Sequence, residues 1–182
     1  NLKKRKSIKL YCFEEPTLQA GQSVYTIPAA AIRTITLGYP DQPRDAEAFF
    51  IDPVDKQLYL ISKRDFHAQV FTAPIFDGKA SSAYVLENIG SLPFTFVTAA
   101  DISATGDAVL MKNLTQIYYW QRPPNRSLKS IFRQDFKLLP YIPEPQGEAI
   151  CFARQGPYFF TVSERPLGLD AYLYQYQLAP NF

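Results

Sequence analysis

A strand–turn–strand pattern recurs along this chain at a spacing of about fifty residues. The two clearest copies are residues 45–64 and 146–165, in which an acidic or polar start leads through an aromatic segment and a turn into a second strand ending at arginine. A more divergent copy occupies residues 97–113. A self-similar unit of this length built from strands is typical of a propeller blade, in which four strands lie around a central axis.

An aromatic third strand follows each copy and stops at a proline. Aromatic and apolar side chains alternate in residues 69–74, 116–123 and 172–180, and residues 7–16 at the chain start have the same form. Proline lacks the amide hydrogen that a sheet requires, so it ends such strands. Outer, fourth strands are predicted at three places, and no helix longer than a single turn is expected. The predicted outer strands are residues 32–38, 83–90 and 129–137.

The pattern therefore predicts an all-β chain that forms an incomplete β-propeller of about three four-stranded blades, with thirteen strands. The predicted units are a blade end at 7–39, blades at 45–90 and 96–137, and a blade at 146–180 that lacks its outer strand. An open arc exposes unpaired edges and large aromatic side chains. A missing N-terminal half of the propeller, another protein chain or a second copy is expected to cover them.

Composition excludes two classes of partner. The formal net charge is only +2, which gives no broad basic surface for nucleic acid. Apolar runs are as short as strands, so no membrane span is expected. The two cysteines, Cys12 and Cys151, lack the spacing of a zinc site and are expected to be buried free thiols.

Four segments together resemble a known family: residues 39–48, 58–64, 98–103 and 146–150. They are similar to bacterial secreted or periplasmic six-bladed β-propellers, distantly similar to esterase-like phytase and NHL-type propellers. The resemblance covers nearly the whole chain and implies an extracellular or periplasmic location. It also implies that this chain is the C-terminal half, preceded in the family by a half with acidic motifs that are absent here. It supplies a fold and no reaction.

Two glutamates are the first candidates for a site. Glu47 and Glu148 occupy the same repeat position at the start of an inner strand, where propeller side chains converge on the central channel. Thr98 is expected at that position in the middle blade, with Asp101 three residues later. Two carboxylates with carbonyl oxygens can form a calcium site, with Glu47 and Glu148 as ligands. Alternatively, such glutamates accept backbone hydrogen bonds and hold neighbouring blades together.

Basic residues at the ends of the second strands form another candidate group. Lys63, Arg64, Lys112 and Arg165 are candidates for an anion-binding rim, although salt bridges between blades explain these residues without any ligand. The single histidine, His67, is the only residue through which a Ser-His-Asp triad can form, and no Gly-x-Ser-x-Gly turn accompanies it.

These features favour an exported binding or scaffold module whose ligand or partner lies at the channel mouth. The alternative is a calcium-dependent hydrolase of the phytase or lactonase type, with its active site in the channel. Whether the chain is an enzyme stays open at this point.

Overall fold

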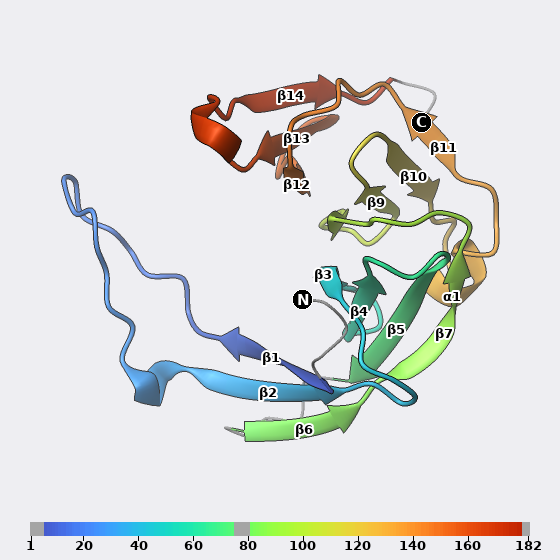
Figure 1. Cartoon of the computed structure of the whole chain (residues 1–182), viewed down its shortest axis with the longest axis horizontal. Coiled ribbons are helices and arrows are strands. Elements are labelled where there is room, and N and C mark those ends of the chain that lie inside the picture. Colours follow the sequence, from blue (N-terminus) through green and yellow to red (C-terminus); the bar gives the residue numbers. More distant parts are fainter. Residues whose placement is uncertain (1–5, 75–80, 180–182) are drawn as a thin grey trace.

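The computed structural model describes residues 6–74 and 81–179. Its strands form four small sheets that stand side by side along an open arc (Figure 1). We number these sheets in chain order as blades 1 to 4. The inner strand of blade 3 lies against the inner strands of both blade 2 and blade 4. Consecutive blades around one axis are the arrangement of an incomplete β-propeller, which confirms the predicted fold class.

The two middle blades have four strands each, and all their pairings are antiparallel. Blade 2 consists, from the inside outwards, of β3 (Ala46–Ile51), β4 (Gln57–Ser62), β5 (Ala68–Pro74) and β7 (Glu87–Leu92). Blade 3 consists of β8 (Ala99–Ile102), β9 (Ala108–Lys112), β10 (Ile117–Gln121) and β11 (Lys137–Leu139).

The two end blades have three strands each among the described residues. Blade 1 contains β1 (Ser7–Cys12), β2 (Arg33–Gly38) and β6 (Ser81–Val85). Blade 4 contains β12 (Gly147–Phe152), β13 (Tyr158–Ser163) and β14 (Leu173–Gln177). Two single-turn 3-10 helices, Ala29–Ala31 and Pro166–Gly168, lie in the connections.

The outer strand predicted at residues 83–90 is wrong as a single element. Leu86, which is 1% exposed, separates β6 from β7, and its amide donates to the carbonyl of Gly38 at 2.8 Å. β6 pairs in parallel with β2 of blade 1, whereas β7 pairs with β5 of blade 2. The described residues therefore contain fourteen strands instead of thirteen. An alternating pattern continues unchanged through such a change of partner, which is why the sequence did not reveal it.

The outer strand predicted at residues 129–137 is also wrong. A single-turn helix, α1 (Leu128–Ile131), occupies its first part, and the outer strand β11 begins only at Lys137. The Ser127 hydroxyl caps α1 by accepting from the Ser130 amide. Leu128 and Ile131 are three positions apart, so both point to one side of the helix and are fully buried.

The core lies between the blades, in three apolar layers. Between blades 2 and 3, Phe94 stacks on Tyr118 with ring centroids 3.7 Å apart, and Trp120 is 2% exposed beside them. The aromatic side chains of β10 are therefore packing residues. In blade 4, by contrast, Tyr172 is largely exposed. No helix in the described part of the chain has the length and apolar character needed to cross a membrane.

Candidate functional site

Glu47 and Glu148 are the extra residues of two equivalent β-bulges. Ala46 pairs with Ser62 but Ala48 pairs with Ile61, and β12 repeats this shift on either side of Glu148. A bulge re-aims the side chain of its extra residue. β8 pairs with β9 without a bulge. Thr98 precedes the first paired residue of β8, Ala99, as Glu47 precedes Ala48, so it takes the expected position. Thr98 is buried and donates to the Gly147 carbonyl at 3.0 Å, so the middle blade presents no carboxylate there.

Lys63 joins the two glutamates. Its ammonium forms an ion pair with Glu47 and lies 3.3 Å from Oε1 of Glu148, eighty-five residues away in sequence. Burial works to lower the pKa of Lys63, but the hydrogen bond to Glu47 and the charges of both glutamates outweigh it and raise that pKa. A charged lysine therefore links blade 2 to blade 4 across the inner end of blade 3.

Further ion pairs surround this link. Arg44 pairs with Asp41 and, at 2.7 Å, with Asp65, and Arg64 Nε lies 2.6 Å from the buried carboxylate of Asp45. We call the whole group the ionic end of the blades; its three cations and five carboxylates carry two net negative charges. The members are Asp41, Arg44, Asp45, Glu47, Lys63, Arg64, Asp65 and Glu148.

Lys112 is a buried link between blades 3 and 4. Its Nζ donates to the Tyr141 hydroxyl at 2.6 Å and to the Gly147 carbonyl at 2.7 Å. Burial lowers the pKa of Lys112 to about 8, against the opposing effect of Glu144 and Glu148. Because the side chain is 0% exposed, Lys112 does not belong to an open rim.

Asp101 connects the same two blades through the backbone. Its Oδ2 accepts from the Phe152 amide at 2.7 Å, and burial raises the pKa of Asp101. This is the blade-to-blade contact that was considered for the glutamates, made instead by a neighbouring carboxylate.

The four basic residues predicted as candidates for an anion-binding rim do not form a shared open site. Lys63 and Arg64 are paired with carboxylates, and Lys112 is buried. Arg165 is 68% exposed and lies 3.4 Å from Asp170. His67 is exposed and its ring lies beside Phe66, at 5.0 Å between centroids. Among the described residues no serine or carboxylate forms a hydrogen bond or ion pair with that ring.

The donor set at the two glutamates fits an ammonium group better than calcium. Both carboxylates already contact the Lys63 ammonium, which a cation would have to displace. Within residues 6–74 and 81–179, no group of three or more acidic, histidine or cysteine side chains is placed to hold a metal. Calcium at Glu47 and Glu148 stays a prediction without support from these donors.

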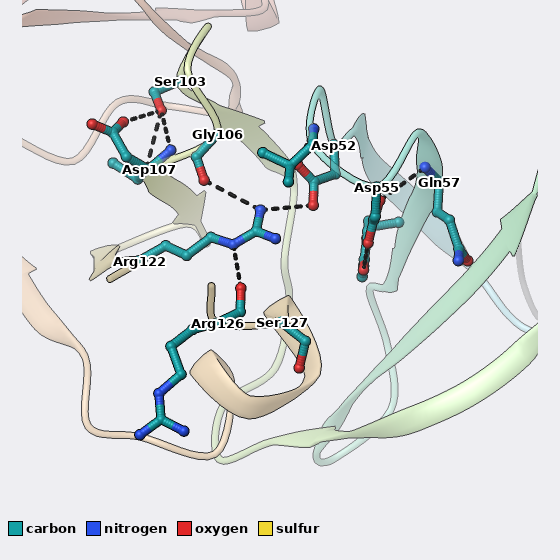
Figure 2. Close-up of polar contacts among 12 residues, drawn as sticks. Asp52, Asp55, Gln57, Ser103, Gly106, Asp107, Arg122, Arg126 and Ser127 are labelled. Atoms are coloured by element: carbon teal, nitrogen blue, oxygen red, sulfur yellow. Dashed lines mark hydrogen bonds and ion pairs between the residues drawn. The ribbon is translucent and has the colours of Figure 1, made fainter. Parts of the chain in front are cut away.

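A hollow that the sequence did not reveal lies between blades 2 and 3, at the end of the strands opposite the ionic end. Figure 2 shows polar side chains around it. The hollow has a volume of about 610 Å³ and is lined by the β3–β4 turn, the β8–β9 turn and the loop after β10. We call it the turn-end groove. Arg122 lies in its floor and pairs with Asp52 at 2.7 Å. Each segment by itself contains the Gly, Pro, Asp or Asn residues typical of turns and no further signal, so the groove arises only where the three segments meet in space.

Comparison with known proteins supports the fold. No family model and no curated protein matches this chain. Among solved structures, it is similar to a chain of a nidogen/laminin complex, with 11% identity, a TM-score of 0.53, and coverage of 93% of this chain and 62% of that one. Hydrazine synthase from Kuenenia stuttgartiensis has 9% identity and a TM-score of 0.52, with coverage of 88% and 49%. TolB from Acinetobacter baumannii has 16% identity and a TM-score of 0.50, with coverage of 84% and 37%.

The matched nidogen and TolB chains are β-propellers, and their likeness agrees with the blade arrangement described above. This chain spans less than two thirds of the length of each of the three structures. At these identities the likeness concerns the fold alone.

Proposed function

We propose that this chain is a binding module whose ionic end recognises a cationic group, an ammonium or a guanidinium, of a ligand or partner at the channel mouth. The observation that carries the proposal is the excess of carboxylates over cations among side chains that reach the surface. Glu47 and Glu148 are about one third exposed, whereas Lys63 between them is 9% exposed.

Each glutamate has acceptor capacity left. Glu47 uses Oε2 and Glu148 uses Oε1 for Lys63, and their other oxygens accept no hydrogen bond from any described residue. Hydrogen bonds from a cation to a carboxylate are shorter and stronger than neutral ones. A second cation approaching from the channel mouth is therefore favoured both by the local charge and by these two oxygens.

The proposal is tested by calorimetric titration with hexalysine at low ionic strength. The double variant Glu47→Gln/Glu148→Gln is expected to lose about tenfold in affinity, since each exposed charge pair contributes up to about 1 kcal/mol. Glu87→Gln is the matched control, because Glu87 is an exposed carboxylate outside the ionic end. Equal affinity of the double variant and the parent protein would overturn the proposal.

We also propose that further propeller strands, from a longer form of the protein, another chain or a second copy, add to the inner edge of β1. Among the described strands β1 pairs only with β2, and a hollow of about 490 Å³ separates it from β3 and β4. Phe49 on β3 is 47% exposed there. Light scattering after size exclusion tests association of this chain: a mass of one chain at all concentrations contradicts pairing with a second copy.

Export from the cell is a further proposal, and it rests on the family resemblance.

Calcium-dependent hydrolysis is the alternative proposal for the function. It is tested by calorimetry with calcium chloride and by turnover assays with a phosphate ester and a lactone. Calcium binding together with turnover, both abolished by Glu148→Gln, would favour the hydrolase over the binding module.

A further inference from the structure

The turn-end groove is remote from the ionic end. β3 begins beside Glu47 and ends at Ile51, and a six-residue strand spans about 20 Å. The groove therefore lies at the opposite end of blades 2 and 3, and a ligand held there does not touch the ionic end.

The floor of the groove is fixed by buried polar contacts. Asp52 is 0% exposed and Arg122 is 8% exposed, and Arg122 also donates to the Gly106 carbonyl at 3.3 Å and, through Nε, to the Arg126 carbonyl at 2.6 Å (Figure 2). Arg122 thereby holds all three lining segments together. The groove is formed before any ligand arrives, which lowers the entropic cost of binding.

Glycine at position 106 is required by this arrangement. Gly106 has φ +74°, and a Cβ there would lie 2.7 Å from a methyl group of Val54. The β8–β9 turn therefore packs directly on the β3–β4 turn, and the two blades present one continuous wall.

The walls carry two carboxylates, Asp55 and Asp107, and one exposed guanidinium, that of Arg126. Both oxygens of Asp55 already accept hydrogen bonds, from the Gln57 amide and the Tyr59 hydroxyl. Oδ1 of Asp107 accepts from Ser103 at 2.5 Å and from Thr105 at 2.7 Å, while Oδ2 accepts nothing from the described residues. The Arg126 guanidinium is exposed and has no ion pair or hydrogen bond within the same part of the chain. Serine and threonine hold the Asp107 carboxylate in place, so its free oxygen has a fixed position.

Apolar surface accompanies these charges. Val54 is 59% exposed, and Pro123 and Pro124 are exposed on the loop after β10. A hollow of this volume is in the usual range for ligand sites, about 300–1,000 Å³.

We propose that the turn-end groove binds an extended peptide segment of a partner protein, which places a basic side chain on Asp107, an acidic side chain on Arg126 and apolar side chains against Val54 and Pro123. The charge complementarity of the two walls selects a segment with both signs of charge. A uniformly acidic or basic peptide satisfies only one wall and is repelled by the other. This site is additional to the proposed function at the ionic end.

Amide chemical-shift titration of the isotope-labelled protein tests the proposal. The probes are nine-residue peptides with one lysine and one glutamate flanking a Val-Pro-Val centre, in both orders, and a control with glutamine at both positions. One order is expected to give saturable shifts at Val54, Thr105 and Asn125, with the neutral control binding roughly fivefold more weakly. The absence of saturable shifts with both charged peptides up to millimolar concentration overturns the proposal.

Variants separate charge recognition from a structural role. Arg126→Gln keeps the backbone carbonyl that accepts from Arg122, and Asp107→Asn keeps the Oδ1 that accepts from Ser103 and Thr105. Each variant is expected to lower the affinity for the charged peptide about threefold and to leave the affinity for the neutral peptide unchanged. Arg154→Gln is the matched control, since Arg154 is an exposed arginine in the β12–β13 turn at the same end of blade 4. Equal losses for all three variants, or shifts with a neutral oligosaccharide but with neither peptide, contradict a peptide site.

Discussion

Asp52 and Arg122, seventy residues apart in sequence, form a buried ion pair of 2.7 Å that ties the β3–β4 turn of blade 2 to the strand exit of blade 3. Removing one member leaves the other charge buried and unpaired. Asp52→Ala is therefore expected to destabilise the protein by about 3–5 kcal/mol in chemical denaturation. The double variant Asp52→Ala/Arg122→Met should recover part of this loss. If the loss of stability in the double variant equals the sum of the losses in Asp52→Ala and Arg122→Met, the two side chains have no interaction energy.

Lys63 fills the space between Glu47 and Glu148 with a positive charge. Lys63→Ala leaves two carboxylates facing each other, and we expect it to bind calcium with a dissociation constant of about 1 mM or lower, the range of weak extracellular sites. Calorimetric titration of the variant beside the parent protein checks this. Adding Glu148→Gln to Lys63→Ala should abolish calcium binding. If the double variant binds calcium as tightly as Lys63→Ala does, the ion binds elsewhere.

The buried ammonium of Lys112 makes stability depend on pH. Its pKa is about 8 in the folded protein and 10.5 when unperturbed, so the unfolded chain binds more protons between these values. Stability from this group therefore increases as pH rises above 8 and is lowest below it. Urea denaturation between pH 7 and 9.5 should show this increase, and Lys112→Met should remove it. The upper limit avoids ionisation of Tyr141, whose pKa burial raises to about 12.

Gly147 has no room for a side chain. A Cβ there would lie 2.4 Å from Nζ of Lys112 and 2.8 Å from the Tyr141 hydroxyl. Gly147→Ala is expected to cost about 1–3 kcal/mol, because the alanine would force apart the link between blades 3 and 4. Gly38→Ala is the matched control, since its Cβ would meet only the Tyr84 carbonyl at 3.9 Å. Thermal unfolding of both variants measures the difference.

The repeat predicted the fold because strand alternation and turn residues are local signals. It also predicted that Glu47 and Glu148 share a position, and both are bulge residues that meet at one ammonium. The identity of that ammonium, Lys63, was not predictable, since its link to Glu148 spans blade 3 in space. The change of sheet at Leu86, where β6 of blade 1 gives way to β7 of blade 2, was not predictable either. Alternation indicates which side of a sheet a residue faces and carries no information on the neighbouring strand.

The turn-end groove could not be predicted from the sequence for a related reason. Asp52, Asp107 and Arg122 each stand in a segment that reads as an ordinary turn or strand end. Their contacts depend on how blades 2 and 3 pack together, and Phe94, Tyr118 and Trp120 form the aromatic layer between those blades.

The parallel strand β6 has a consequence for how the protein comes apart. Its residues lie between β5 and β7 of blade 2 in the chain, yet its backbone completes the sheet of blade 1. Excising the repeat at residues 45–90 would remove β6 from blade 1, so blades 1 and 2 should melt as one cooperative unit, while the outer strand of blade 4 frays independently. Hydrogen exchange would then show a common opening rate for the amides of β2 and β5, and a faster one for β14.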